Sequence, residues 1–505
     1  MRIGEVLDRV YDEEVGWRPV TGTIKPVHIA NGMFRALTGR QHDISRIIAF
    51  IVWWRKKNEK LRHEQRTFAR LVTDQPEGPF ACFRTDERRF DQARDFARAI
   101  LGTDSAVFPD ADHSSLTLTC AQMISPDEFD RGLGAFAAAL VGGASGDAPL
   151  AAAVRSALDV DQPDDPVSTL VWPLLDHRGR SVTVAAPPAM DSLAARAPDY
   201  IAQLQAAAAC LATHEANQGN RLRTLQRAVH FACVSTQSHV QALVAEGVLA
   251  DRIPALLAVR SPTGSALTTA SETTLTLLHD RFEDWLRDRL AARIAAGQPL
   301  HRGETIDLAV LRPSAAVERL DEVLRDIGPY GRGQGQLTDE VLKHRFEDLE
   351  EALRLHPEPT ERAAALAHAI WAAYRREYGS GGPRQYLLRI GRWSGLIYPH
   401  FQGPGQKRVR PTVALLDMLV RSCVPCGESV PLEDFLERLW LRFGLIAGGR
   451  GDGQHDAALL RRHGVDLDAN RLVENTEDLV DQLAALGLAR RYADNVTFVG
   501  DGHAA

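Results

Sequence analysis

Two groups of residues in the sequence have the side chains that bind metal ions. One is the pair Cys423 and Cys426, the only Cys-x-x-Cys pattern in the chain. A structural zinc ion needs four ligands, so His455 and His463 would have to complete the site. Because zinc sites rarely pair their ligands so irregularly, we expect no zinc ion here. The absence of a βαβ pattern around the pair also argues against a thioredoxin-like role.

The second group surrounds His279 and Asp280, in a stretch with helical patterning. Histidine and carboxylate ligands on facing helices can hold two metal ions, as a helical metal phosphohydrolase requires. The spacing here is not distinctive, and histidines on amphipathic helices are usually partly exposed polar residues. We therefore expect no metal and no cofactor, and keep such an enzyme as an alternative. The neighbouring candidates are His230, His239, Asp284 and Asp288.

The motifs of common enzymes are absent. No Gly-Lys pair exists, so there is no P-loop, and no acidic residue stands two positions before any of the six lysines, as a common nuclease motif requires. The patterns H-E-x-x-H and G-x-S-x-G are also missing. The glycine-rich stretches 331–335 and 448–453 lack the strand–turn–helix setting of a dinucleotide site and are expected to be flexible loops. We favour a non-enzymatic protein.

Basic residues offer a different kind of chemistry, the binding of nucleic-acid phosphates. A basic run follows two tryptophans in the first hundred residues, and three of the six lysines lie between positions 56 and 60. Aromatic and basic side chains together can stack on bases and contact phosphates. The alternative is an amphipathic helix with a solvated basic face. The nucleic-acid-binding candidates in this run are Trp54, Arg55, Lys56, Lys57, Lys60, Arg62 and Arg66.

The C-terminal fifth of the chain has the clearest pattern of elements. Apolar residues at helical spacing predict one helix from Pro411 and a second from Leu432. A third is expected to begin at Asn475 or Thr476, before an acidic first turn, and a hairpin should follow over 488–499. This order of helix, helix, loop, helix and hairpin resembles the winged-helix family of DNA-binding and protein-docking modules.

In that family the helix before the wing usually enters the major groove, where Arg, Lys, Asn or Gln read the bases. Here the stretch 474–486 carries four carboxylates and no basic residue. We therefore favour a protein-docking winged helix, with a sequence-specific DNA-binding regulator as the alternative. The basic groups lie beside this stretch, and the candidates for contact with nucleic acid are Lys407, Arg408, Arg410, Arg490 and Arg491.

Composition and length indicate an ordinary globular protein of several domains. With 45% hydrophobic and 25% charged residues in 505, the chain can build real cores, and its net charge of −7 gives no overall attraction to nucleic acid. We expect a mainly α fold with small β elements (α+β). The expected domains are a mixed α/β region with the basic helix over 1–142, a hairpin plus helical domain over 150–300, a helical domain over 301–405 and the winged-helix-like domain over 406–505. The hairpin is expected over 168–185, with helices following at about 190–217, 220–247 and 270–297. In the helical domain, helices are expected at about 338–355 and 360–378.

The N-terminus lacks the apolar segment of a signal peptide, and the longest apolar run, 47–54, is too short to span a bilayer. We expect a cytoplasmic protein without membrane contact. Its Arg- and Ala-rich composition is typical of a GC-rich bacterial genome. The function we favour is a non-enzymatic adaptor in a bacterial nucleic-acid-handling complex, with phage defence as one setting. It would dock partner proteins of that complex, with DNA as a further candidate partner.

Overall fold

The chain is mainly helical with several small sheets, as expected from the sequence. The predicted basic helix, with its candidates from Trp54 to Arg66, lies outside the described residues. No described helix has both the length and the apolar composition needed to cross a lipid bilayer. The computed structural model describes residues 1–19, 24–44, 118–126, 129–142, 148–162, 164, 172, 175–216, 220–301, 303–306, 316–329, 337–378, 382–400, 407–492 and 496–502.

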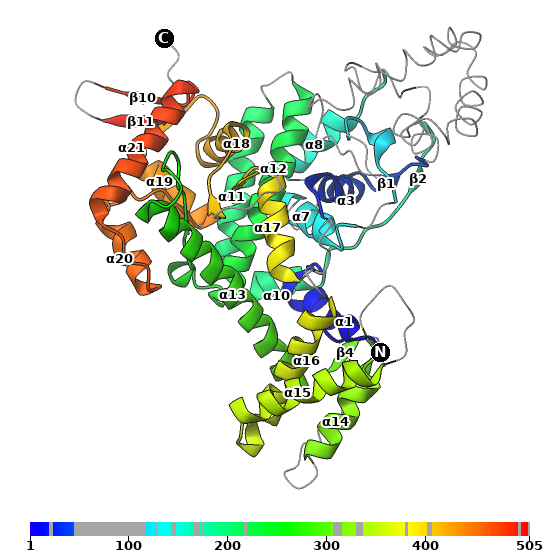
Figure 1. Cartoon of the computed structure of the whole chain (residues 1–505). Coiled ribbons are helices and arrows are strands. Elements are labelled where there is room, and N and C mark those ends of the chain that lie inside the picture. Colours follow the sequence, from blue (N-terminus) through cyan, green and yellow to red (C-terminus); the bar gives the residue numbers. More distant parts are fainter. Residues whose placement is uncertain are drawn as a thin grey trace, which may run out of the picture.

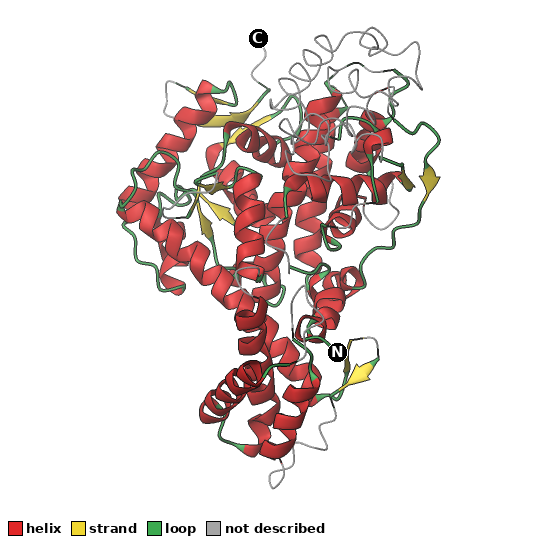
Figure 2. Ribbon diagram, turned by 45° about the vertical axis from the view of Figure 1, so that its right-hand side comes forward, coloured by secondary structure: helices red, strands yellow, loops and turns green. Residues whose placement is uncertain are grey.

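Helices make up most of each part of the molecule (Figure 2). The α-helices are α1 (Ile3–Val6), α2 (Asp8–Val10), α3 (Pro26–Thr38), α7 (Leu133–Gly142), α8 (Pro149–Leu158), α10 (Ala189–Arg196), α11 (Pro198–Glu215), α12 (Arg221–Val244), α13 (Ala266–Ala295), α14 (Ala316–Asp326), α15 (Asp339–Leu355), α16 (Arg362–Tyr378), α17 (Pro383–Trp393), α18 (Val413–Cys423), α19 (Leu432–Phe443), α20 (Gln454–Arg462) and α21 (Ala469–Ala485).

The strands are short and form small sheets. They are β1 (Arg40–Gln41), β2 (Arg180–Ser181), β3 (Ala255–Leu256), β4 (Pro299–His301), β5 (Glu304–Thr305), β6 (Ile397–Tyr398), β7 (Arg408–Val409), β8 (Ser429–Pro431), β9 (Leu445–Ile446), β10 (Ala489–Arg491) and β11 (Thr497–Gly500). The last sheet has the order β10-β11-β8, with both pairs antiparallel, so the hairpin expected near the C-terminus is present. The strand pair β1–β2 joins segments that are far apart in the sequence.

Helix α12 lies at the centre of the molecule and binds the backbone of segments from both ends of the chain (Figure 1). The Nε2 of His239 donates to the carbonyl of Val15 at 2.9 Å. The side-chain amide of Gln241 donates to the carbonyls of Ile253 and Gly444 at 3.0 and 3.1 Å. Most of the helix is buried, so these polar residues would be costly without partners. These hydrogen bonds explain how a helix with many polar residues can lie in a core.

Helix α13 connects the upper part of the molecule to the group formed by α14, α15 and α16 (Figure 1). It begins at Ser265, whose hydroxyl accepts from the backbone N–H of Thr268 at 3.2 Å. Near this end Ser271 joins two strands: it donates to the carbonyl of Leu256 at 2.6 Å and accepts from the N–H of Val409 at 3.0 Å. The helix therefore fixes β3 and β7 relative to each other.

The junction between the C-terminal elements and the rest of the chain is a run of paired strands. Strand β3 pairs in parallel with β9, while β6 pairs with β7 in antiparallel fashion. An isolated parallel bridge joins Leu257 to Val409, so the segment after β3 lies beside β7. Asn475 of α21 closes the junction: it accepts from the N–H of Val259 at 3.1 Å and donates to the carbonyls of Leu257 and Ala447, both at 2.7 Å.

Two expectations for the C-terminal region were wrong. Helix α21 begins at Ala469, six residues before Asn475, and its cap is Asp468, which accepts from the N–H of Asn470 at 2.8 Å. Polar character at Asn475 and Thr476 suggested a cap, but both are buried inside the helix. The expected loop before this helix also contains α20, with one turn over 450–453 before it and another at 463–464 after it.

Two expectations for the middle of the chain also need correction. The helix expected over 190–217 is two helices, α10 and α11, since Pro198 begins a new helix and cannot continue the preceding one. Strand β2 was expected in a hairpin with the segment before it, but Arg180 and Ser181 pair with Gln41 and Arg40. The helices predicted near 220–247 and 270–297 are confirmed as α12 and α13.

Candidate nucleic-acid interface

The end of α17 is shaped by a tight turn that places its last residues against the β6–β7 pair. Gly395 adopts φ +83°, and the N–H groups of Gly395 and Leu396 donate to the carbonyls of Arg392 and Gly391 at 3.2 and 2.8 Å. These two bonds form a Schellman motif, which favours glycine at this position. A side chain at Gly391 would collide with Ile397 of β6, so the helix and the strand can approach closely only with glycine there.

Two arginines of the following strand pair flank one aromatic ring. Tyr398 and Arg408 are partners across the β6–β7 ladder, and the guanidinium carbon of Arg408 lies 4.6 Å from the Tyr398 ring centroid. Arg410 lies 5.2 Å from the same centroid. Arg408 is buried, and its Nη1 donates to the hydroxyl of Thr263 at 3.3 Å. The electron-rich face of the ring attracts each guanidinium, and these cation–π contacts offset part of the repulsion between the two charges.

The positive charges here are close enough to repel one another. Burial, followed by the charge of Arg410, lowers the pKa of Arg408. Burial, followed by the charge of Arg389, lowers the pKa of Arg392, and burial followed by Arg392 lowers that of Lys407. We call this group the basic corner: Arg389, Arg392, Trp393, Tyr398, His400, Lys407, Arg408 and Arg410.

The acidic residues of the chain do little to neutralise this group. Within the described part of the chain, Arg389, Arg392, Arg408 and Arg410 form no ion pair with a carboxylate within 4.0 Å. The carboxylate of Glu272 opposes the lowering of the Lys407 pKa by burial and by Arg392. Arg389, Arg392 and Arg410, which are not fully buried, thus keep the capacity to bind an anion from outside the fold.

One exposed aromatic side chain and two half-buried rings lie beside these cations. Trp393 ends α17 and is 47% exposed, which is high for so large an apolar side chain. The Nζ of Lys25 lies 5.8 Å from its ring centroid, which brings a further cation from the N-terminal region to the same place. The rings of Tyr398 and His400 lie 5.5 Å apart, edge to face. Cations beside exposed rings can bind phosphates and stack on bases at once.

The structure brings together three of the predicted residues and adds two that the sequence analysis missed. Lys407 lies near Arg392, and Arg408 lies near Arg410. The N–H of Arg410 donates to the carbonyl of Leu396 at 2.9 Å, which joins the second pair to the end of α17. Arg389 and Arg392 were missed, although they stand three residues apart on a helix and therefore share one face. The buried face of that helix is formed by Tyr386, Leu387, Ile390 and Gly391 together with Pro383.

The predicted wing residues have a different environment. Arg491 is paired with two carboxylates of α21, Glu477 at 2.6 Å and Asp481 at 3.1 Å. Arg490 is exposed, with its guanidinium carbon 5.4 Å from the ring centroid of Tyr492. The other carboxylates of this acidic helix also have arginine partners. These further pairs are Arg260–Asp481 at 3.4 Å, Arg260–Asp478 at 4.0 Å and Arg471–Glu474 at 2.8 Å.

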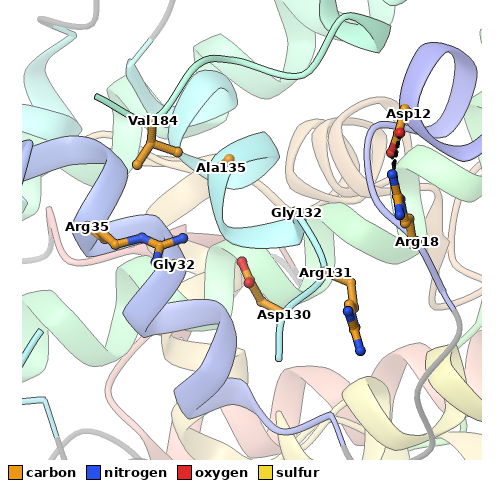
Figure 3. A pocket seen from close by; sticks show the side chains of 9 residues that line it. All are labelled: Asp12, Arg18, Gly32, Arg35, Asp130, Arg131, Gly132, Ala135 and Val184. Carbon is orange, nitrogen blue, oxygen red and sulfur yellow. Dashed lines mark hydrogen bonds and ion pairs between the residues drawn. The ribbon is translucent and has the colours of Figure 1, made fainter. Parts of the chain in front are cut away.

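A second candidate is a recess of about 380 Å³ between the N-terminal segment, α3 and the start of α7 (Figure 3). Arg18 donates to both carboxylate oxygens of Asp12, at 2.9 and 2.6 Å, and to Asp8 at 2.9 Å. Asp130 accepts from the N–H of Gly134 at 2.7 Å and so caps the first turn of α7. Since these charged groups are used within the fold, we place the candidate interface at the basic corner.

Among the described residues, the two candidate metal-binding groups considered in the sequence do not come together. Burial lowers the pKa of His279 to about 3, and Asp280 pairs with Arg384 at 3.1 Å. Cys423 is buried, which raises the pKa of its thiol to about 12. In the described part of the chain, one group of three residues holds ligand-type atoms within 4.8 Å of one another. Its members are His214, Cys426 and Asp501.

Comparisons with known proteins add no further candidate. No protein-family model matches the chain, and no curated protein or solved structure matches it either. The functional argument therefore depends on the chemistry of the basic corner, its aromatic neighbours and the charges around it.

Proposed function

We propose that the protein is a non-enzymatic component of a nucleic-acid-handling assembly and binds the phosphate backbone through the basic corner. The observation that carries this proposal is the group Arg389, Arg392, Arg408 and Arg410, which lie beside other cations and, within the described residues, form no ion pair with a carboxylate, in a chain whose net charge is −7. A bound polyanion would relieve their repulsion. The net negative charge gives the whole chain no attraction to a polyanion, so binding requires a local basic group such as this corner.

The roles within the corner follow from its side chains. Arg389, Arg392 and Arg410 would bind phosphates, since a guanidinium offers a planar fork of donors. Arg408 is buried and would hold Tyr398 in place through its cation–π contact. Trp393 would stack on an unpaired base, which favours single-stranded regions or ends. This arrangement reads the backbone and gives little discrimination between sequences.

We also propose that α18, β8, α19, α21, β10 and β11 form a winged helix that docks partner proteins. The support is the order of these elements and the sheet order β10-β11-β8. The carboxylates on α21 are already paired with Arg260, Arg471 and Arg491. A helix that reads bases needs side chains that donate hydrogen bonds to base edges. The exposed face of α21 instead carries carboxylates, which accept hydrogen bonds from arginine. A surface of paired charges suits a polar protein interface better than a DNA groove.

The test is direct binding of labelled single- and double-stranded DNA, measured by fluorescence anisotropy at low salt. The variant Arg389→Ala/Arg392→Ala/Arg410→Ala removes three charges from the corner. The control variant Arg223→Ala/Arg281→Ala/Arg462→Ala removes three exposed charges elsewhere. We expect the corner variant to bind at least about tenfold more weakly than the control variant.

Two results would count against the proposal. Equal loss of affinity in both variants would mean that overall charge, rather than the corner, is responsible. An absence of binding by the wild-type protein at low salt would remove the nucleic-acid role of this surface. A strong preference for one duplex sequence would instead support reading of bases by the C-terminal elements.

A further inference from the structure

The end of α11 presents a histidine whose ring is already oriented. His214 is buried, and its Nε2 lies 2.7 Å from the carbonyl oxygen of Val424. A carbonyl oxygen can only accept, so Nε2 carries the proton and Nδ1 keeps its lone pair. Metal-binding histidines are commonly held in this way, with the second nitrogen donating to a backbone carbonyl.

Two further ligand-type groups converge on that lone pair from distant segments. The Oδ2 atom of Asp501, just after β11, lies 3.3 Å from Nδ1 of His214. Its Oδ1 atom accepts from the N–H of Gly427 at 2.9 Å, which fixes the carboxylate. Cys426 follows α18, and its backbone N–H donates to the hydroxyl of Thr213 at 2.9 Å. The ligand atoms of the histidine, the cysteine and the aspartate all lie within 4.8 Å of one another.

We infer that His214, Cys426 and Asp501 form a binding site for a divalent metal ion of the zinc class. A nitrogen, a sulfur and an oxygen ligand together suit a borderline-soft ion such as Zn²⁺. Three protein ligands leave a fourth tetrahedral position for a water molecule. The sulfur binds as a thiolate, so the Cys426 proton is released to solvent when the metal–sulfur bond forms.

The fold already places a cation at this point. Nη1 of Arg421 lies 2.9 Å from Nδ1 of His214 and 3.4 Å from Oδ2 of Asp501. A bound metal ion would coordinate Nδ1 of His214 and Oδ2 of Asp501 in place of Arg421. Arg421 can turn away while its Nε keeps its bond to Asp417, which measures 2.8 Å. Arg421 is therefore a competitor of the metal, and its removal should strengthen metal binding.

The charges around the cluster favour a divalent cation. Glu215, Asp417 and Asp501 supply three negative charges, while Arg227 and Arg421 supply two positive charges. One net negative charge remains, and the Cys426 thiolate raises it to two, which a divalent ion would neutralise. The ion would fasten the segment after β11 and the loop after α18 to the end of α11. This inference is independent of the nucleic-acid role.

The test uses the full chain, freed of metal with a chelator and then titrated with Co²⁺ and Zn²⁺. Bound Co²⁺ should show the near-ultraviolet charge-transfer absorption of a cobalt–thiolate bond, and Zn²⁺ should raise the melting temperature. Cys426→Ser should abolish the absorption, and Asp501→Asn should weaken Zn²⁺ binding by about tenfold or more. Cys210→Ser, at another partly exposed cysteine, is the matched control and should change neither.

The variant Arg421→Met makes the test sharper, because a merely structural hydrogen-bond network would respond differently. It removes the competing cation and should increase the affinity for Zn²⁺. The substitution should also lower the melting temperature of the metal-free protein, and added Zn²⁺ should restore it. The inference is overturned if the cobalt–thiolate absorption persists in Cys426→Ser. It is equally overturned if the wild-type chain binds no stoichiometric metal, or if Arg421→Met lowers metal affinity.

Discussion

The ring of Tyr398 lies 4.6 Å from the guanidinium carbon of Arg408, its partner across the β6–β7 ladder. Arg410 approaches the same ring at 5.2 Å, so one ring stabilises two charges that would otherwise repel each other. Tyr398→Leu should lower the free energy of unfolding by about 1 kcal/mol, the usual strength of such a contact. Urea denaturation followed by circular dichroism would measure this. Tyr398→Phe keeps the ring and should stay close to wild type; equal loss in both variants would refute the cation–π role.

Trp393 should matter most for single strands. Its exposed ring can stack on an unpaired base, and such stacking contributes about 1–3 kcal/mol per base. Trp393→Ala should therefore weaken binding of single-stranded DNA more than binding of duplex DNA, in anisotropy titrations of both. Tyr492→Ala, at another exposed aromatic residue, is the control. A uniform loss on both kinds of DNA would exclude stacking by Trp393.

The wing arginines should contribute little to nucleic-acid binding. Arg491 is held by Glu477 and Asp481, so a phosphate would have to displace two carboxylates. Arg490→Ala/Arg491→Ala should leave the DNA affinity within about threefold of wild type, less than the loss expected at the basic corner. The titration at low salt that tests the corner also tests this pair. A loss as large as that of the corner variant would show that phosphates reach the wing.

Asn475 should be a strong determinant of stability. Its side chain satisfies the N–H of Val259 and the carbonyls of Leu257 and Ala447 inside the core. Asn475→Ala would leave these buried groups unpaired and should lower the free energy of unfolding by about 3 kcal/mol. Asn470→Ala, at an exposed position of the same helix, should have a much smaller effect in urea denaturation. Similar losses at both positions would show that the bonds of Asn475 contribute little.

The lowered pKa values of two buried histidines predict that the free energy of unfolding decreases in acid. Burial lowers the pKa of His239 and of His279 to about 3, below the ordinary value of 6.5. Above pH 6.5 neither state binds the proton, so there is no contribution. As the pH falls from about 6.5 toward 3, only the unfolded chain binds it, and each histidine removes about 1.4 kcal/mol per pH unit.

His279→Leu replaces one of these two titrating side chains with an apolar side chain at the same buried position. The free energy of unfolding should then decrease less steeply between pH 6.5 and 4, when urea denaturation is repeated across that range. His177→Leu, at an exposed histidine, is the control and should keep the wild-type dependence. An unchanged slope in His279→Leu would mean that this histidine is protonated in the folded protein.

Local sequence patterns were enough to predict much of the fold. The apolar spacing that predicted helices over 338–355 and 360–378 is reproduced by α15, which buries Leu349 and Ala352, and by α16, which is buried over most of 365–374. The start of α21 was misplaced because Asn475 resembles a cap when its core partners are unknown. Those partners, Leu257, Val259 and Ala447, lie just after β3 and β9, and their positions depend on tertiary packing.

The sites were harder to predict than the helices. Lys407, Arg408 and Arg410 are neighbours in sequence, so their shared charge was visible. Their closeness to Arg389 and Arg392 depends on the turn at Gly395 and the glycine contact at Gly391. The group of His214, Cys426 and Asp501 comes from three separate segments, and no local spacing connects them.

The salt dependence of DNA binding tests the central claim most directly. Each phosphate contact releases a counterion, so log K falls linearly with log salt concentration, with a slope of about −0.9 per contact on duplex DNA. Arg389→Ala/Arg392→Ala/Arg410→Ala should make the slope less negative by roughly 2–3. The control variant Arg223→Ala/Arg281→Ala/Arg462→Ala should keep the wild-type slope. An unchanged slope in the corner variant would contradict the assignment of backbone binding to the basic corner.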